Sequence, residues 1–256
     1  MRRIVLFLVT AFMFGGFAAS AARGPMAATP LSREDLAWWH QRHAAKLAEL
    51  AQKHPTLIFL GDSITQQWEN GARGDFPSYI PAWGRFYGDR NAVNLGFTGD
   101  ATAHLLWRIQ NGEVAGIAPK VAVVLIGANN LGKVHWGSED TLTGIEAVTK
   151  ELRRRLPTTH ILLLSVLPSE RTAWATRMTL LINQGLAQRY PAGGDVTFLD
   201  VTHAFMKEGR INRDMFLEAA LPAGTALLHP SLRGQIALSE AIEPTLAKLL
   251  GDRPHK

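Results

Sequence analysis

The sequence contains no cysteine, and this absence excludes several kinds of site. A chain without thiols cannot form disulfides, zinc–thiolate centres or iron–sulfur clusters, and it offers neither a cysteine nucleophile nor a lipidated N-terminal cysteine. Charged residues are also sparse, at 19% of the 256 residues, whereas 46% are hydrophobic. A disordered chain needs the opposite balance, and the 23 glycines follow no triplet period of the collagen kind. We therefore expect a globular protein with one sizeable core.

The chain also lacks the signatures of nucleotide, nucleic-acid and metal binding. Neither the Gly-x-Gly-x-x-Gly pattern nor the Walker lysine pattern is present. The formal net charge is +5, but the basic residues are scattered, with no dense tract beyond Arg153–Arg155. This distribution favours solubility or mild anion attraction over a nucleic-acid interface. His40 and His43 lie three apart without a nearby acid, which indicates a surface pair. We predict no metal, no cofactor and no nucleic-acid partner.

The first residues have the pattern of a targeting segment. Arg2 and Arg3 precede an apolar run from Ile4 to about Ala19, and small residues follow over Ala18–Ala22. A charged start, an apolar middle and a small-residue end are typical of a secretory signal peptide, here residues 1–22. The alternative is an uncleaved membrane anchor, because the run approaches the length that spans a bilayer. We expect an exported protein, periplasmic or extracellular, with no stable membrane span after cleavage.

Strand-like and helix-like stretches alternate along the rest of the chain. Apolar runs predict buried strands at Thr56–Leu60, Asn91–Leu95, Val121–Ile126, His160–Val166 and Val196–Leu199. Helical spacing predicts helices at Ala101–Gln110, Thr141–Arg155, Ala173–Tyr190 and Arg233–Leu250, and another that starts with a capping box at Ser32 and Asp35 and runs to Lys53. The alternation predicts a three-layer α/β/α fold, flavodoxin-like, around a five-stranded parallel sheet. We divide the mature chain into an N-terminal extension and helix, residues 23–54, and one α/β domain, residues 55–252.

Polar and glycine-rich motifs follow the predicted strands. Gly61-Asp62-Ser63 comes after the first strand, Gly96–Asp100 after the second and Gly127–Asn130 after the third, and His229 precedes the last helix. The carboxyl ends of parallel strands meet at one edge of a sheet, which is where such folds bind ligands. A serine, glycine-rich turns, an amide and a histidine at this edge are the parts that acyl transfer needs.

These motifs resemble those of the GDSL/SGNH hydrolases. The segment Asn94–Glu113 is similar to the platelet-activating-factor acetylhydrolase catalytic-subunit-like branch of that superfamily, and the resemblance extends from about Leu57 to the last helix. It implies an SGNH hydrolase domain in which Ser63 is the nucleophile and His229 the general base. It also implies an oxyanion hole made by the backbone N–H groups of Ser63 and Gly99 and by the side chain of Asn129.

One position departs from the family pattern. The family usually has an aspartate three residues before the histidine, and this sequence has Ala226 there. Three explanations are open, of which we favour the first: a main-chain carbonyl orients the imidazole of a Ser–His pair, or Asp214 or Glu218 supplies the acid, or catalysis is weak or lost. A second Asp-x-x-His spacing occurs at Asp200 and His203, but it follows the fifth strand directly, too early in the order of motifs.

The expected function is that of an exported serine esterase. The resemblance implies short acyl groups such as acetyl, and export suggests a small ester or an O-acylated glycan or lipid as substrate. The alternatives are a catalytically weak or inactive glycan- or lipid-binding protein and an O-acyltransferase that uses the same residues. Substrate-pocket candidates are Asp62, Trp68, Phe97 and Trp136, although Asp62 and Asp100 also suit structural hydrogen bonds. The sequence carries no signal of an oligomeric state.

Overall fold

The structure is a computed structural model that describes residues 25–255. The predicted signal peptide and residues 23 and 24 lie outside this range, so those predictions stay untested. None of the helices in the described range combines the length and hydrophobicity that a bilayer-spanning segment needs.

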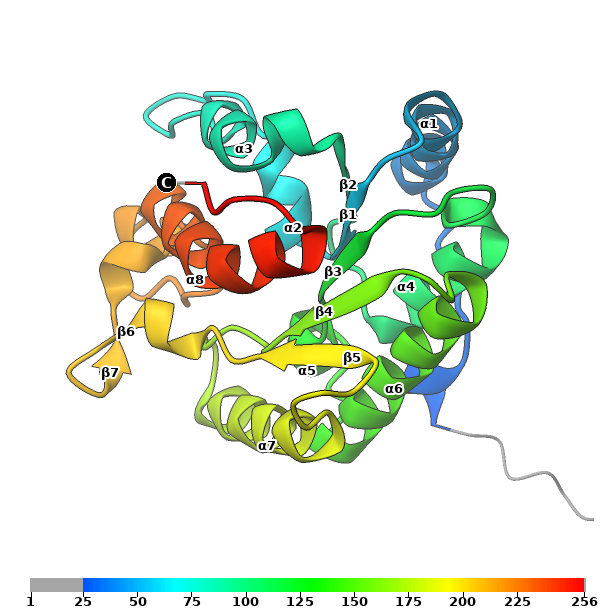
Figure 1. Cartoon of the computed structure of the whole chain (residues 1–256). Helices are drawn as coiled ribbons and strands as arrows, with labels where there is room; N and C mark the ends of the chain where they lie inside the picture. The colour runs from blue at the N-terminus through cyan, green and yellow to red at the C-terminus, as the bar shows by residue number, and fades with distance from the viewer. Residues whose placement is uncertain (1–24, 256) are drawn as a thin grey trace, which may run out of the picture.

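A five-stranded parallel sheet forms the centre of the molecule (Figure 1). Its strands stand in the order β2-β1-β3-β4-β5, the flavodoxin-like order. Each begins and ends within two residues of the predicted bounds, so the predicted sheet is confirmed. The bounds are β1 Leu57–Gly61, β2 Ala92–Gly96, β3 Val121–Leu125, β4 His160–Leu164 and β5 Val196–Leu199.

Helices cover both faces of the sheet and give the predicted three layers. In Figure 1, α8 lies with α2 and α3 on one face, and α4, α6 and α7 lie on the other. The sequence analysis missed α3, the short helix α5 and the small β6–β7 hairpin. The bounds are α1 Ala37–Lys53, α2 Ser63–Gln66, α3 Ile80–Tyr87, α4 Thr102–Arg108, α5 Ala128–Gly132, α6 Ser138–Arg155, α7 Ala173–Arg189, α8 Leu232–Leu250, β6 Met206–Lys207 and β7 Arg210–Ile211.

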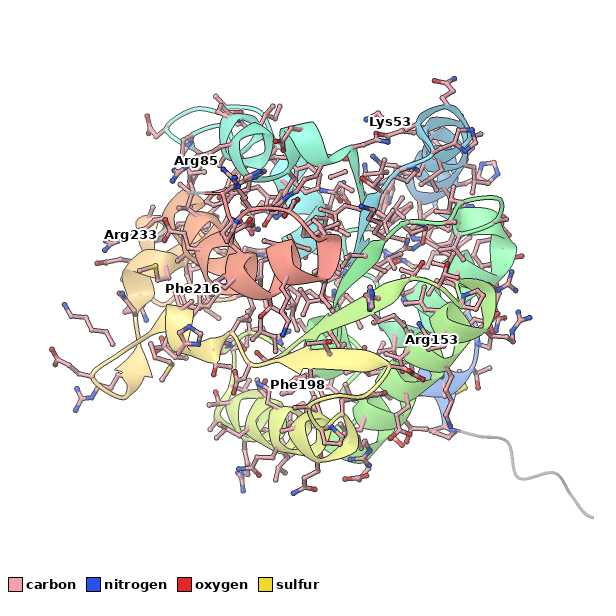
Figure 2. The ribbon with its side chains drawn as sticks, in the orientation of Figure 1. Lys53, Arg85, Arg153, Phe198, Phe216 and Arg233 are labelled. Carbon is pink, nitrogen blue, oxygen red and sulfur yellow. The ribbon has the colours of Figure 1, made fainter. Side chains whose placement is uncertain are left out.

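Strands β1, β2 and β3 are buried along their whole length. Full burial explains why their sequences are continuous apolar runs rather than alternating patterns, since helices cover both faces. Each buried leucine, isoleucine or valine side chain stabilises the fold by about 1.5–3 kcal/mol. Long charged side chains such as those of Lys53 and Arg233 project outward around the periphery (Figure 2).

Helix α1 differs from its prediction in two ways. It begins at Ala37 after Leu36, which offers no capping side chain, so the capping box at Ser32 and Asp35 is wrong. His43 is also not a surface residue: its ring packs 5.8 Å from the Trp39 ring and 5.4 Å from the Trp107 ring, and only 6% of it is exposed. Burial, assisted by the nearby positive charge of Arg108, lowers the pKa of His43 to about 4.

Candidate active site

Ser63 is the first residue of α2, directly after the end of β1. The Asp62 side chain caps this helix by accepting a hydrogen bond of 2.9 Å from the Ile64 N–H. Two more side chains hold the short helix: Asn94 of β2 donates to the Thr65 carbonyl, and Gln235 of α8 donates to the Ile64 carbonyl. The position of Ser63 is therefore fixed by side chains from β2 and α8, which are far apart in the sequence.

Gly96 allows α2 to lie directly against β2. A Cβ atom at this position would lie 2.2 Å from the backbone nitrogen of Gln66, a distance that packed atoms do not tolerate. Any larger residue would therefore push α2, and Ser63 with it, away from the sheet.

The side chains of Ser63, His229 and Glu218 form a continuous polar chain. Ser63 Oγ lies 3.0 Å from Nε2 of His229, and Nδ1 of the same ring lies 2.7 Å from Oε1 of Glu218. The Glu218 carboxylate also accepts hydrogen bonds from the backbone N–H groups of Leu228 and His229. About a third of the His229 side chain is exposed, so the serine–histidine pair faces solvent. This is the geometry of a nucleophile, a base and an orienting acid.

An irregular segment brings the acid to the histidine. The Leu217 N–H donates to the His229 carbonyl at 2.8 Å, and Phe216 and Pro230 form an isolated bridge. Burial raises the pKa of the Glu218 carboxyl, but the hydrogen bonds from His229 and Leu228 outweigh it and hold this pKa below its ordinary value. Glu218 is therefore ionised at neutral pH.

This arrangement decides among the three explanations for Ala226. Nδ1 of His229 faces a carboxylate rather than a main-chain carbonyl, so the explanation that we favoured does not describe the structure. Asp214 does not contact the ring, since its side chain is 75% exposed and lies 3.9 Å from Arg233. Glu218 is the acid at the histidine, eleven residues before it in the chain.

The expected oxyanion donors lie in the segments that follow β1, β2 and β3. Gly99 has a φ of +81°, a conformation that a residue with a side chain rarely adopts. Within residues 25–255, neither the Gly99 N–H nor the Ser63 N–H has a hydrogen-bond acceptor. The Asn129 side chain donates to the Asp100 carbonyl at 3.0 Å, and the same nitrogen lies 3.4 Å from the Asp62 carboxylate. Burial raises the pKa of Asp62 to about 6.

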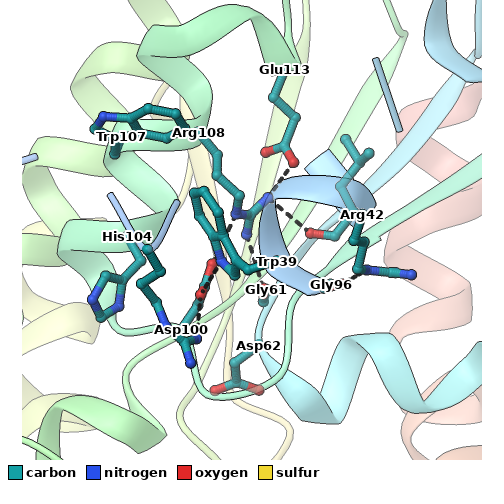
Figure 3. A network of polar contacts seen from close by, with 12 residues as sticks. Trp39, Arg42, Gly61, Asp62, Gly96, Asp100, His104, Trp107, Arg108 and Glu113 are labelled. Carbon is teal, nitrogen blue, oxygen red and sulfur yellow. Dashed lines mark hydrogen bonds and ion pairs between the residues drawn. The ribbon is translucent and has the colours of Figure 1, made fainter. Parts of the chain in front are cut away.

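A buried ion network lies behind these loops (Figure 3). Arg108 is completely buried and donates to Asp100 and Glu113, and also to the carbonyl of Gly61 at 3.1 Å. Asp100 accepts further hydrogen bonds from the indole of Trp39 and from Arg33. The network ties the end of β1 to the loop that carries Gly99. Leaving one member of such a network unpaired typically costs about 3–5 kcal/mol.

Several pocket candidates occupy other places. Trp68 and Phe97 are core side chains, 4% and 0% exposed, and Phe97 packs beneath the Arg108 guanidinium, so neither lines an open pocket. Asp62 is 1% exposed and serves as the helix cap described above. Trp136 is half-buried in the segment after α5. The exposed pair Asp200 and His203 lies after β5: Asp200 accepts hydrogen bonds from Thr202, and neither side chain reaches Ser63.

The sequence analysis missed three cations near the candidate site. Arg33 and Lys133 lie against Gly99, and Arg171 lies against α5. Arg33 precedes α1, far from the motifs in the chain, and no spacing rule connects it to them. Within the described range, no group of three or more histidine, aspartate or glutamate side chains is placed to hold a metal ion.

Comparison with known proteins gives one family. The family model described as GDSL-like lipase/acylhydrolase matches residues 59–236, which include Ser63, Glu218 and His229. Platelet-activating factor acetylhydrolase IB subunit alpha2 from Rattus norvegicus is 29% identical over 236 residues, covering 90% of this chain and 94% of that protein. The Gallus gallus protein of the same name is 30% identical over 201 residues, or 77% of this chain and 82% of its own.

Solved structures share the fold at lower sequence identity. A GDSL-like lipase from Bacteroides thetaiotaomicron matches with a TM-score of 0.60 and 19% identity, over 82% of this chain and 97% of that one. A carbohydrate acetylesterase family member from Sinorhizobium meliloti matches with a TM-score of 0.55 and 18% identity, over 77% and 99% of the two chains. These likenesses confirm the three-layer α/β/α fold.

Proposed function

Because the chain belongs to the GDSL-like lipase/acylhydrolase family, we propose that it is an exported serine esterase that hydrolyses short-chain acyl esters. The observation that carries the proposal is the 3.0 Å contact between Ser63 Oγ and His229 Nε2, backed by the 2.7 Å contact between His229 Nδ1 and Glu218. The names of the relatives, which include acetylhydrolases and a carbohydrate acetylesterase, support an acetyl-sized acyl group.

The first half of the reaction forms an acyl enzyme. Ser63 Oγ attacks the ester carbonyl carbon while its proton moves to Nε2 of His229. The carbonyl oxygen becomes an oxyanion, which accepts hydrogen bonds from the Ser63 and Gly99 N–H groups and the Asn129 amide. The tetrahedral intermediate then collapses, and the alcohol leaves with the proton that His229 returns to it. Ser63 is left carrying the acyl group.

The second half releases the acid. A water molecule gives a proton to His229 Nε2 and attacks the acyl carbon, and the same donors hold the second oxyanion. Collapse of this intermediate returns the proton to Ser63 Oγ and frees the carboxylic acid. Glu218 contributes to both halves because its negative charge stabilises the imidazolium and its contact with Nδ1 fixes the ring so that Nε2 faces the serine.

The acid beside His229 argues against the alternative of an inactive binding protein. The reason to consider an inactive binding protein was the missing acid at Ala226, and Glu218 occupies the position that such an acid needs. The proposal also retains export, because of the N-terminal pattern, and an O-acylated glycan or lipid as the natural ester.

The test compares p-nitrophenyl acetate hydrolysis by the wild type and by single variants. We expect Ser63→Ala and His229→Ala to lower kcat by at least about 10³-fold, since either change removes a group that acts in the transition state. His203→Ala is the matched control, because it removes an exposed histidine outside the site, and it should leave the rate unchanged. Equal rates for the wild type and Ser63→Ala would refute the esterase. Adding a sugar acceptor and measuring its acylation separates hydrolysis from acyl transfer.

A further inference from the structure

Two positively charged side chains lie at the same edge of the sheet as Ser63. Lys133 directly follows α5, which comes after β3, and Arg171 comes after the neighbouring strand β4. The carboxyl ends of parallel strands share one edge, so both residues come from the loops that surround the candidate site. Lys133 Nζ lies 2.5 Å from the point that a Cβ atom on Gly99 would occupy, which places the ammonium group against the expected oxyanion loop.

Arg171 contacts both ends of α5. Its guanidinium occupies the space that a side chain on Gly132 would fill, and its Nη2 donates to the Ala128 carbonyl at 2.9 Å. Burial lowers the pKa of Arg171, and only the nearby negative charge of Asp62 opposes this effect. Lys133 and Arg171 therefore both lie at the short helix that carries Asn129.

The four cations near the candidate site differ in their partners. Arg33 and Arg108 are matched by Asp100 and Glu113 in the buried network. Within residues 25–255, neither Lys133 nor Arg171 has an ion pair. Asp62 is the acid whose negative charge acts on Arg171, but it makes no hydrogen bond to the guanidinium. A half-buried arginine and an exposed lysine, both without an ion pair, therefore lie in the loops around Ser63.

We propose that Lys133 and Arg171 bind an oxyanion group, a carboxylate or a phosphate, carried by the substrate close to its scissile ester. This inference rests on the proposed function and narrows its substrate to acyl esters of acidic alcohols. A planar guanidinium and an ammonium point charge are the two cations that proteins use for such groups. The unpaired cations also draw anionic substrates to the site over distances of about 10 Å at ordinary ionic strength.

The experiment compares esters that differ only in charge. The anionic esters are 4-acetoxybenzoate and 4-acetoxyphenyl phosphate, and the neutral counterpart is 4-acetoxybenzamide. The measured quantity is the ratio of kcat/KM for each anionic ester to that for the neutral one, in the wild type, Lys133→Glu and Arg171→Gln. Lys150→Glu is the matched control, since it makes the same charge change at an exposed position of α6. Lys150 lies near Val196, at the amino end of β5, whereas the candidate site is at the carboxyl ends of the strands. The larger of the two ratios identifies carboxylate or phosphate as the preferred group.

We expect the wild-type ratio to be above one. It should fall by about tenfold in Lys133→Glu, because this change removes one charge-assisted contact, and by a smaller factor in Arg171→Gln. Lys150→Glu should change it by less than about twofold. Raising the salt concentration should lower the wild-type ratio, because salt screens exposed charges. A ratio that responds equally to Lys133→Glu and Lys150→Glu overturns the inference. So does an equal loss on charged and neutral esters, which would mean that Lys133 acts on the oxyanion itself.

A binding measurement keeps this inference separate from the esterase proposal. Ser63→Ala protein is titrated calorimetrically with 4-hydroxybenzoate and with 4-hydroxybenzamide, and the pair is repeated with Lys133→Glu added. Tighter binding of the carboxylate that disappears with Lys133→Glu supports the anion site even if no ester is hydrolysed. Equal binding of the two compounds overturns the anion site even if hydrolysis by the wild type is rapid. Thermal melting of each variant confirms that it is folded.

Discussion

Replacing Glu218 by glutamine tests the central contact of the site. The carboxylate accepts three hydrogen bonds, from Nδ1 of His229 and from the backbone N–H groups of Leu228 and His229. A glutamine has the same shape but only one oxygen. If that oxygen faces the ring, the NH₂ group of the glutamine points at the backbone N–H groups. If the oxygen faces the backbone, the NH₂ group points at the N–H of Nδ1. The first orientation leaves a backbone donor without an acceptor. The second is relieved only if the ring carries its proton on Nε2, which then cannot accept the Ser63 proton.

The magnitude follows from the charge and burial of Glu218. Its side chain is 8% exposed and lies 2.7 Å from the ring, so solvent screens little of its interaction with the imidazolium that forms in the transition state. In serine proteases, disabling the corresponding acid lowers turnover by about 10⁴-fold. For Glu218→Gln we expect kcat/KM to fall by about 10²–10⁴-fold, equivalent to about 3–5 kcal/mol of transition-state stabilisation.

Initial rates with p-nitrophenyl acetate, measured across the pH range, provide the assay. Hydrogen bonds hold the pKa of Glu218 below its ordinary value, so the carboxylate of the wild type stays charged until the pH is well into the acid range. Glu218→Gln should therefore lower the rate throughout the neutral and mildly acid range, because the negative charge that it removes is present over all of that range. Asp214→Asn is the matched control, because its side chain is 75% exposed and remote from the ring. A Glu218→Gln enzyme with more than about a third of the wild-type rate across this range would contradict the role of this acid.

Three further predictions concern the alanine at the usual acid position, the packing of α2 and the pH dependence of stability. Ala226→Asp should change kcat/KM by less than about threefold, because the ring already has a carboxylate partner, and a gain of about tenfold in steady-state rates would count against this. Gly96→Ala places a Cβ atom 2.2 Å from the α2 backbone, so urea unfolding should show a loss of about 1–3 kcal/mol together with a lower kcat. Gly84→Ala fills open space in α3 and should raise stability by up to about 1 kcal/mol, and equal urea midpoints for the two alanine variants would refute the packing argument. His43 has a pKa of about 4 in the folded protein and 6.5 when unfolded, so the folded state binds fewer protons between these values and stability falls as the pH drops from 6.5 to 4. His43→Phe should remove this pH dependence, so the unfolding free energy of the variant, measured against that of the wild type, should be about 2 kcal/mol more favourable at pH 5 than at pH 8. The same difference between variant and wild type at both pH values would contradict this.

The sheet was predictable because each strand carries its own signal. Val121–Leu125 is apolar without alternation, which is the pattern of a strand covered on both faces, and β1 and β4 show similar apolar runs. Helices α3 and α5 were missed because a helix of one or two turns has too few residues to show a period. The prediction of a capping box at Ser32 was wrong because the residue spacing fits the motif, whereas the helix begins only after Leu36.

Half of the candidate site was predictable for a topological reason. Ser63, Gly99 and Asn129 follow strands β1, β2 and β3, and parallel strands end at one edge of a sheet. The histidine was found by its order in the chain and by resemblance to the family. Phe97 was placed wrongly because a glycine-rich turn in the sequence does not reveal that this ring packs beneath Arg108.

The sequence by itself determined the layered fold and placed Ser63, Gly99 and Asn129 after the ends of neighbouring strands, because consecutive residues carry the signals of strand burial and of strand ends. Only the tertiary structure decided that Glu218 contacts His229, that His43 and Arg108 are buried, and that Lys133 lies against Gly99 and Arg171 against α5. These outcomes depend on segments without a repeating pattern, such as the bridge between Phe216 and Pro230. Where no period links residues, their proximity is set by how the whole chain packs.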